Sequence, residues 1–335
     1  MTEFITIPWS ALVTALVIAF TISAVATPLV LKWATKLQLF DLPGGRHLHA
    51  SPTPRLGGLA IYLSILVTAL VLLGLTPQLF GVYLGMTIVF VLGYLDDRYS
   101  LPPILKLSGQ ILAASVLVLF GNTITNLTNP FGGHLLLPVG IDVLLTIFWT
   151  VLIINAINFL DGLDGLASGV SAIGATCIAA LSLFAIVNQP DTAILSSVVL
   201  GAALGFLVYN WHPAKIFMGD SGSHVLGFML ASLSIISGSK LATAGLVLGL
   251  PIIDLIWSSI RRIRAGHTPW TPDQQHFHHR LLEKGRTQRM VVIVFYLVSA
   301  LFGIIALASG TVVKIVSFFL VALLMWWLAY SRPKA

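Results

Sequence analysis

The sequence predicts an all-α, polytopic integral membrane protein with about eleven transmembrane helices. Of its 335 residues, 57% are hydrophobic and only 9% are charged, whereas soluble proteins carry roughly 25% charged residues. The mean hydropathy is +0.97, and apolar runs long enough to cross the hydrocarbon core as helices recur along the whole chain. This composition excludes a soluble enzyme, a disordered tail and a nucleic-acid-binding module.

Eleven apolar ranges are the candidate spans. They are 8–31, 57–75, 79–95, 104–121, 140–158, 165–187, 193–210, 222–238, 241–260, 291–309 and 311–330. Only Ser309 and Gly310 separate the last two, so ten spans are an alternative. The first range is too long for a signal peptide and follows Glu3 rather than basic residues, so we do not expect its cleavage. We expect a single membrane-embedded domain over 1–335, with a long cytoplasmic loop over 261–290.

The basic residues predict the orientation of the chain. With eleven spans, 16 of the 18 Lys and Arg residues fall on one side, and only Lys240 and Lys314 fall on the other. The positive-inside rule assigns the basic side to the cytoplasm. We therefore expect the N-terminus outside and the C-terminus in the cytoplasm. The net charge of +6 is then explained by topology and attraction to anionic lipid, and we expect no nucleic-acid partner.

Acidic residues and histidines gather on the same side. Nine of the twelve acids and seven of the nine histidines fall in the predicted cytoplasmic part, which the positive-inside rule does not explain, since acids contribute little to orientation. A transporter would more often place acids near the middle of the membrane. The pattern therefore predicts an active site at the cytoplasmic face.

Two adjacent carboxylates follow the third predicted span, in "LDDR". Asp96 and Asp97 lie at the C-terminal end of that helix, where the helix dipole disfavours anions, and they repel each other. Arg98, Lys106 or a divalent cation could offset this charge. The alternative is a solvated loop end without a role in chemistry.

A second polar run, "NAINFLDGLDG", follows the fifth span. Asn155 and Asn158 are three residues apart, as are Asp161 and Asp164, and each Asp precedes a glycine. If Asp164 begins the next helix, the i, i+3 spacing places both carboxylates on one face. An N-cap at Asp164 followed by turn glycines is the alternative, but it explains only one of the four polar side chains.

A third acid, Asp220, lies in "MGDSGS" at the start of the eighth span. A carboxylate flanked by glycines there is a candidate hard oxygen ligand, next to backbone amides that can meet phosphate. A plain helix N-cap is again the alternative.

The long loop over 261–290 contains candidate contacts for an anion or for sugar hydroxyls. They are Arg261, Arg262, His276, His278 and His279. We do not expect a zinc site, because there is no His-Glu-x-x-His helix and Cys177 is the only cysteine. The arginines are equally compatible with anchoring a helix at lipid phosphates. In the first loop, His49 is either part of the active-site wall or plain loop.

Together these residues predict a Mg²⁺ or Mn²⁺ site for phosphate chemistry. Hard cations prefer carboxylate and phosphate oxygens, and the nearby Arg, Lys and His residues suit a phosphorylated substrate. A soluble phosphate donor and a lipid acceptor would explain why the site lies at a membrane surface. The sequence lacks a Walker loop, a dinucleotide fingerprint and a nucleophile elbow, which argues against ATPases, dinucleotide enzymes and serine hydrolases.

In this order, "LDDR", "NAINFLDGLDG", "MGDSGS" and "PDQQHFHHR" resemble the motifs of the polyprenyl-phosphate N-acetylhexosamine-1-phosphate transferases. The resemblance extends from about residue 41 to residue 286 and includes the eleven-span plan. It implies a bacterial inner-membrane enzyme that transfers a sugar 1-phosphate from a UDP-N-acetylhexosamine to undecaprenyl phosphate, releases UMP and needs Mg²⁺. Homodimers occur in the family, and the oligomeric state stays open here.

The resemblance also implies roles for individual residues. Asp220 is the expected main Mg²⁺ ligand, Asp97 is the other expected metal-site residue, and Asp96 is expected to deprotonate or orient the lipid phosphate. Whether attack is direct or proceeds through an aspartyl-phosphate stays open. The implied catalytic residues are Asp96, Asp97, Asp161 and Asp164, and the implied substrate-binding residues are Asn155, Asn158, Lys106, His49, Arg261, Arg262, His276, His278 and His279.

The histidine loop suggests the sugar. It is similar to the WecA/TagO-like branch, which uses UDP-GlcNAc, whereas the peptidoglycan branch carries three consecutive histidines where Phe277 interrupts them here. The expected product is undecaprenyl-diphosphate-GlcNAc, the start of an O-antigen, common antigen or teichoic-acid linkage unit. The same reaction with MurNAc-pentapeptide, GalNAc or a diacetamido sugar is the main alternative. A transporter or flippase and a non-catalytic scaffold are more distant ones.

Overall fold

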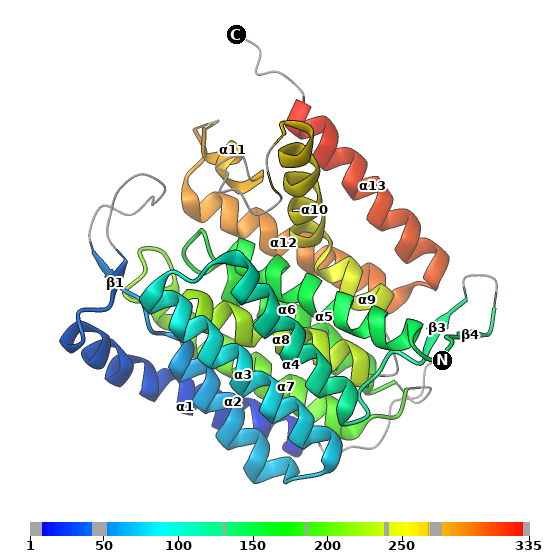
Figure 1. Cartoon of the computed structure of the whole chain (residues 1–335), viewed down its shortest axis with the longest axis horizontal. Coiled ribbons are helices and arrows are strands. Elements are labelled where there is room, and N and C mark those ends of the chain that lie inside the picture. The colour runs from blue at the N-terminus through cyan, green and yellow to red at the C-terminus, as the bar shows by residue number, and fades with distance from the viewer. Residues whose placement is uncertain are drawn as a thin grey trace.

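The computed structural model describes residues 9–41, 52–129, 132–184, 187–237, 241–266, 268, 277–283 and 285–330. Over these residues the chain folds into thirteen α-helices and two short antiparallel hairpins (Figure 1). The protein is therefore all-helical apart from two hairpins in its loops, as the sequence predicts. The hairpins are β1 (Phe40–Asp41) with β2 (Thr53–Pro54), and β3 (Asn126–Thr128) with β4 (His134–Leu136).

Each of the eleven predicted ranges contains a helix. The helices are α1 (Trp9–Lys36), α2 (Gly58–Leu73), α3 (Pro77–Tyr99), α4 (Pro103–Leu119), α5 (Ile141–Leu160), α6 (Leu166–Ser182), α7 (Pro190–Asn210), α8 (Gly219–Ile236), α9 (Leu241–Val247), α10 (Gly249–Arg264), α11 (Phe277–Glu283), α12 (Gln288–Ala308) and α13 (Thr311–Tyr330). Several of them begin where the sequence supplies a helix start. Prolines occupy the first turns of α3, α4 and α7, where the missing N–H costs nothing.

Five of these helices are long and apolar enough to cross a membrane alone: α1, α3, α5, α7 and α12. The bent pair α9 and α10 counts as a sixth only if its two pieces cross together as one span. Further apolar helices, α2, α4 and α6, have 16 or 17 residues, which is short for an untilted span. The chain is a polytopic membrane protein.

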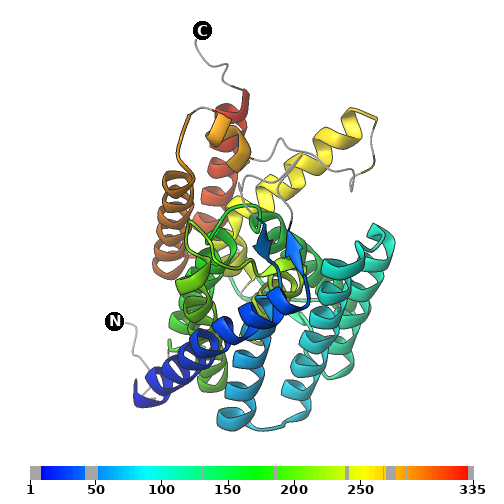
Figure 2. The same cartoon turned by 90° about the vertical axis from the view of Figure 1, so that its left-hand side faces the viewer.

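The predicted span over 241–260 is not one straight helix. α9 and α10 meet at Leu248 with a bend of 78°. Pro251, in the first turn of α10, has no N–H to bond the carbonyl of Val247, so the helical hydrogen-bond ladder is interrupted there. Figure 2 shows the consequence: α10 (yellow) leans away from the rest of the bundle.

The predicted long loop over 261–290 is partly helical. α10 continues to Arg264, α11 occupies 277–283, and α12 begins at Gln288 after Thr287 caps its first turn. α11 is fixed at its start, because the backbone N–H of Phe277 donates to Oδ1 of Asp254 in α10 at 3.0 Å. Figure 1 shows α11 near the end of the molecule that carries the β1 strand, away from the β3–β4 hairpin.

Helix α8 lies at the centre of the bundle. It packs against α3 and α5 most extensively and also contacts α2, α6 and α7, and its side chains are almost all buried. Because α8 faces protein rather than lipid, it can carry polar residues that a lipid-exposed helix could not. Close approach depends on glycines: a Cβ at Gly58 of α2 would lie 2.3 Å from the backbone nitrogen of Gly222 in α8.

Candidate active site

The predicted aspartates come from three different helix ends and meet in one place. Asp96 and Asp97 lie in the last turn of α3, Asp161 is the C-cap of α5, and Asp220 is the second residue of α8. The side chains of Asp96 and Asp97 are 5% and 4% exposed, so their charges are largely removed from water. Buried carboxylates need counter-charges, and two basic side chains supply them.

Arg55 is the first of these basic residues. Its Nε atom lies 2.9 Å from Oδ1 of Asp97, and its Nη2 atom lies 2.9 Å from Oδ1 of Asp220. One guanidinium therefore joins the end of α3 to the start of α8, through an ion pair with Asp97 and a charge-assisted hydrogen bond to Asp220. The backbone around Arg55 is fixed as well, since it forms a parallel bridge with Phe217.

Lys106, in the first turn of α4, is the second. Its ammonium forms ion pairs with Oδ2 of Asp96 and, at 3.3 Å, with Oδ2 of Asp220. Lys106 thus joins the carboxylate of Asp96 to that of Asp220. Of the counter-charges that the sequence suggests for the aspartate pair, the structure uses Lys106, whereas the Arg98 guanidinium lies over the ring of Tyr99, 5.6 Å from its centroid.

Asp97 differs from the other carboxylates of this cluster because its hydrogen-bond donors all come from the first turn of α8. Besides Arg55, its oxygens accept the backbone N–H of Asp220 at 2.8 Å, the backbone N–H of Ser221 at 3.1 Å and the hydroxyl of Ser221 at 2.9 Å. A carboxylate offers about four lone-pair positions. All four are occupied by protein donors.

The two asparagines occupy different positions around the cluster. Asn158 donates from Nδ2 to Oδ1 of Asp220 at 3.1 Å and to the hydroxyl of Ser223 at 2.9 Å, so it belongs to the cluster. Asn155 lies one turn earlier and donates to Oε1 of Gln110 at 2.7 Å. Nε2 of Gln110 in turn lies 3.5 Å from Nε2 of His224, a fully buried histidine one turn after Asp220.

If fully ionised, the cluster would carry more negative than positive charge. Four carboxylates, those of Asp96, Asp97, Asp161 and Asp220, face the two cations Arg55 and Lys106. Burial raises the pKa of Asp161 well above its ordinary value, Arg55 opposes the shift, and Asp220 and Asp97 reinforce it. Burial lowers the pKa of Arg55, but Asp97 and Asp220 raise it more, so the guanidinium stays charged.

The donor chemistry suits a hard divalent cation, which would neutralise the excess charge of the fully ionised cluster. Mg²⁺ commonly takes only one or two carboxylates from a protein and completes its shell with water and substrate phosphates. Among the described residues, no three His, Cys, Asp or Glu side chains form a ready-made metal site. Asp220 and Asp96 are the carboxylates that fit this role, because Oδ2 of each pairs with the ammonium of Lys106, whereas both oxygens of Asp97 accept donors from the start of α8.

Asp164 does not begin α6 as the sequence suggested. It precedes Gly165, which has a φ of +77° and caps α6, and the helix begins at Leu166. The helical i, i+3 relation with Asp161 is therefore not formed. Instead, Oδ2 of Asp164 accepts a hydrogen bond from Nδ1 of His212 at 2.6 Å and from the backbone N–H of Ala214 at 3.1 Å.

The arginines of α10 lie on its last turn. Arg262 is buried, with its guanidinium over the ring of Phe159, 5.6 Å from the ring centroid. Arg261 donates from Nη2 to the hydroxyl of Ser258 at 3.4 Å. Phe159 lies next to Asn158 in α5, so this contact brings Arg262 to the α5 end that carries the polar run.

The predicted histidines fall largely outside the described part. His49 and His276 are not among the described residues, and of His278 and His279 only the backbone is described, in the first turn of α11. Their predicted contacts with substrate stay predictions.

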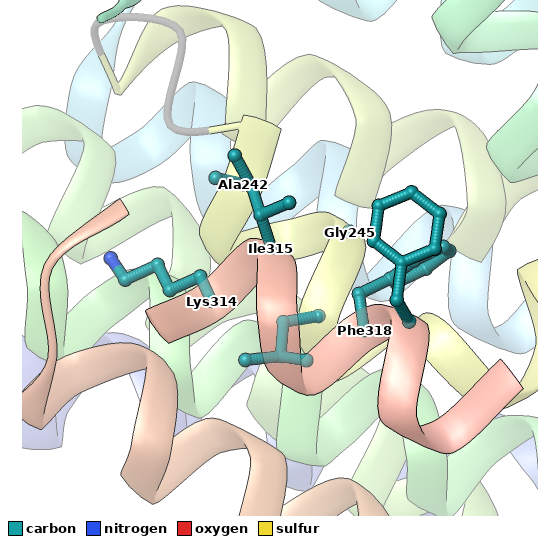
Figure 3. A pocket seen from close by; sticks show the side chains of 7 residues that line it. Ala242, Gly245, Lys314, Ile315 and Phe318 are labelled. Carbon is teal, nitrogen blue, oxygen red and sulfur yellow. The ribbon is translucent and has the colours of Figure 1, made fainter. Parts of the chain in front are cut away.

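A separate pocket of about 170 Å³ lies between α9 and α13. Figure 3 shows Lys314 at one end of it and Phe318 at the other. Its walls are apolar, and its lining residues are Ala242, Gly245, Leu246, Lys314, Ile315, Phe318 and Phe319. None of the predicted site residues lines it, so it is distinct from the aspartate cluster.

Several site residues did not stand out in the sequence. Arg55 directly precedes "LGG" at the start of α2, and a basic residue beside paired glycines was a signal of a tight, charged turn. His212, Gln110, Ser221 and Ser223 had no such signal. They are found only when the loops and helices are assembled.

Comparison with known proteins identifies the family. The model of "Glycosyl transferase family 4" matches residues 79–238, which include the aspartate cluster and both asparagines. The chain is 39% identical over 323 residues to the decaprenyl-phosphate N-acetylglucosaminephosphotransferase of Mycobacterium leprae, covering 86% of this chain and 80% of that protein. It is 36% identical over 328 residues to the "probable undecaprenyl-phosphate N-acetylglucosaminyl 1-phosphate transferase" of Bacillus subtilis, covering 92% and 89%.

A third relative is the undecaprenyl-phosphate alpha-N-acetylglucosaminyl 1-phosphate transferase of Escherichia coli O157:H7, 30% identical over 290 residues, with 83% of this chain and 78% of that protein covered. The chain belongs to glycosyl transferase family 4, within the polyprenyl-phosphate sugar-1-phosphate transferases.

Proposed function

We propose that this chain transfers GlcNAc-1-phosphate from UDP-GlcNAc to a polyprenyl phosphate, undecaprenyl or decaprenyl, and releases UMP. The observation that carries the proposal is the aspartate cluster, in which Lys106 joins Asp96 to Asp220 and Arg55 joins Asp220 to Asp97. The relatives named above carry this transfer in their names. Phosphoryl transfer needs mainly positioning and neutralisation of charge, and this cluster offers both.

The reaction forms one P–O bond and breaks another. An oxygen of the lipid phosphate attacks the β-phosphorus of the donor, and the bond from that phosphorus to the oxygen of UMP breaks. Asp96 would orient the acceptor phosphate and take its proton if it carries one. Arg55 and Lys106 are placed to oppose negative charge on the transferred phosphate, because both side chains lie at the cluster and are 32% exposed.

We further propose that the reaction uses Mg²⁺, with Mn²⁺ as a substitute. Asp220 would supply the main protein oxygen, and the cation would neutralise the phosphates when bound. Asn158 would keep Asp220 in place through the hydrogen bond from Nδ2 to Oδ1 at 3.1 Å. Asp161 and Asp164 would line the nucleotide side.

Arg261, Arg262 and the histidines at 276, 278 and 279 would bind the diphosphate and the N-acetyl sugar. Support for this comes from the contact of Arg262 with Phe159, next to Asn158. His49 from the first loop and Asn155 complete the proposed binding residues. Asn155 would act through Gln110, to which it is hydrogen-bonded.

The proposed topology has eleven spans, with the N-terminus outside, the C-terminus in the cytoplasm and the cluster at the cytoplasmic face of a bacterial inner membrane. The charge distribution of the loops supports it. α2, α4, α6, α8 and α13 would then cross with the longer helices, α9 and α10 as one bent span. A homodimer, which occurs in the family, stays a prediction.

The test is UMP release by the purified full chain in detergent. UDP-GlcNAc, undecaprenyl phosphate and Mg²⁺ are supplied together, and each is omitted in turn. We expect UMP only when all three are present, and none when EDTA is in excess. UMP from UDP-GlcNAc without the lipid would contradict the transfer. Release from UDP-GalNAc or UDP-MurNAc-pentapeptide but not from UDP-GlcNAc would keep the reaction and overturn the sugar.

A further inference from the structure

Helix α8 lacks an N-cap of its own. Met218, the residue before its first turn, caps no backbone amide with its side chain. The first amides of a helix have no partner within the helix. Here the carboxylate of Asp97, which belongs to α3, accepts the N–H groups of Asp220 and Ser221 at 2.8 and 3.1 Å. Asp97 therefore caps α8 from another helix.

The contact leaves no room for a side chain at Gly219. This residue has a φ of +69°, and a Cβ there would lie 2.5 Å from Oδ2 of Asp97. In α3, one turn before Asp97, a Cβ at Gly93 would lie 2.5 Å from the carbonyl oxygen of Asp220. The backbone of Asp220 is thus held against α3 by close packing on one side and by the Asp97 carboxylate on another.

The oxygens of Asp97 are also fully used. Oδ1 accepts the Asp220 N–H and forms the ion pair with Arg55 Nε, and Oδ2 accepts the N–H and the hydroxyl of Ser221. A cation ligand needs a lone pair that points at the metal. Binding a cation through Asp97 would therefore require breaking one of these four contacts and uncapping α8.

We propose that Asp97 is a positioning residue, which fixes the backbone of Asp220 and the guanidinium of Arg55 and gives no oxygen to the bound cation. The proposal deepens the transferase function proposed above and rests on it for the role of Asp220. The two adjacent aspartates then have different roles. Asp96 pairs with Lys106 and would act on the substrate, whereas Asp97 keeps Arg55 and the start of α8 in position.

Two variants test this proposal by changing the contact between the Asp97 carboxylate and the start of α8, one on each partner. Asp97→Asn removes one acceptor oxygen and presents N–H groups to donors. Gly219→Ala removes no carboxylate, but its added methyl group would collide with the side chain of Asp97. The matched control is Gly74→Ala: Gly74 has a φ of +70°, and nothing lies within 4 Å of its Cβ position. It also places a side chain at a positive φ, but without the contact to Asp97.

The first readout is hydrogen exchange of the peptide that spans 216–224, measured by mass spectrometry on the full chain. We expect faster exchange in Asp97→Asn and Gly219→Ala and no change in Gly74→Ala. This readout needs neither substrate nor metal, so it stands even if the donor sugar or the reaction proposed above is wrong. Unchanged exchange in Asp97→Asn would overturn the capping role. Should Asp97→Asn not fold, Ser221→Ala, which deletes one donor to Asp97, takes its place.

The second readout is Mn²⁺ binding by electron paramagnetic resonance, together with kcat. We expect Asp97→Asn to retain Mn²⁺ binding within about tenfold of the original chain, while kcat falls on the order of 100-fold, as displaced catalytic groups do. Gly219→Ala should likewise retain Mn²⁺ binding while its kcat falls. Asp220→Asn should lose Mn²⁺ binding itself. Loss of Mn²⁺ binding in Asp97→Asn as complete as in Asp220→Asn would show that Asp97 is a ligand.

Discussion

Nδ1 of His212 lies 2.6 Å from Oδ2 of Asp164, across 48 positions of sequence. The carboxylate fixes the orientation of the imidazole ring and leaves Nε2 for another partner. The same loop is held from a third element, because Arg289 in α12 donates from Nη2 to the carbonyl oxygen of His212 at 3.0 Å. The pair thus ties the loop before α6 to the loop before α8, which carries Asp220.

We expect His212→Ala and Asp164→Asn each to lower kcat/KM for UMP release by roughly tenfold. Since both substitutions break the same contact, the double variant should be little worse than either single one, which is the signature of a coupled pair. The control is His134→Ala, in the exposed strand β4 at the other end of the bundle. Additive losses in the double variant would show that the two residues act independently.

Asp96→Asn and Asp220→Asn should abolish turnover while the protein stays folded. Each change removes a negative oxygen that faces Lys106 and, in our proposal, the acceptor phosphate or the cation. The measurement is UMP release with a detection limit at least about 1,000-fold below the original rate, since loss of a group that acts in the transition state lowers kcat by such factors. Asp191→Asn, in the exposed first turn of α7, should be fully active. Activity in both cluster variants would contradict the site.

Lys106→Met should destabilise the chain as well as inactivate it. The substitution keeps much of the side-chain volume but leaves the carboxylates of Asp96 and Asp220 without the cation between them. Removing one partner of a buried ion pair costs about 3 kcal/mol at the lower end of the usual range. Thermal unfolding in detergent measures this, and added Mg²⁺ should restore part of the lost Tm. Lys32→Met, at an exposed position of α1, should leave Tm unchanged.

We expect the stability of the folded chain to depend on pH because of Asp161. Burial raises its pKa in the folded chain, so the folded state holds this proton more tightly than the unfolded state. The stabilising effect is complete below the ordinary Asp pKa of about 3.9 and is lost as the pH rises through the raised value. Asp161→Asn does not titrate, so its Tm relative to the original chain should improve from about pH 5 to about pH 9.

The meeting of the aspartates could be predicted because topology alone brings them together. Asp96, Asp161 and Asp220 each lie where a span ends or begins, and the positive-inside rule puts those ends on one face. The partners of the aspartates could not be predicted in the same way. The approach of Arg55 to Asp220 depends on the bridge between Arg55 and Phe217, a long-range pairing without a periodic signal.

The break between α9 and α10 has a local signal in the sequence, Pro251, but this signal does not fix the angle of the break. Pro251 can kink a helix mildly or end it, and the sequence alone does not give the 78° bend between α9 and α10. An acid inside a helix, such as Asp254, needs a partner, and one donor to it is the backbone N–H of Phe277.

The cap that Asp97 provides for α8 spans 123 positions of the chain. During synthesis, Asp96 and Asp97 leave the ribosome with α3, long before α8 exists. Lys106 follows ten residues after Asp96 and can pair with it early. The amides of Asp220 and Ser221, which donate to Asp97, are synthesised much later. The centre of the protein is therefore completed only when α8 has been made: until then Asp97 can pair with Arg55 but lacks the amide donors of Asp220 and Ser221.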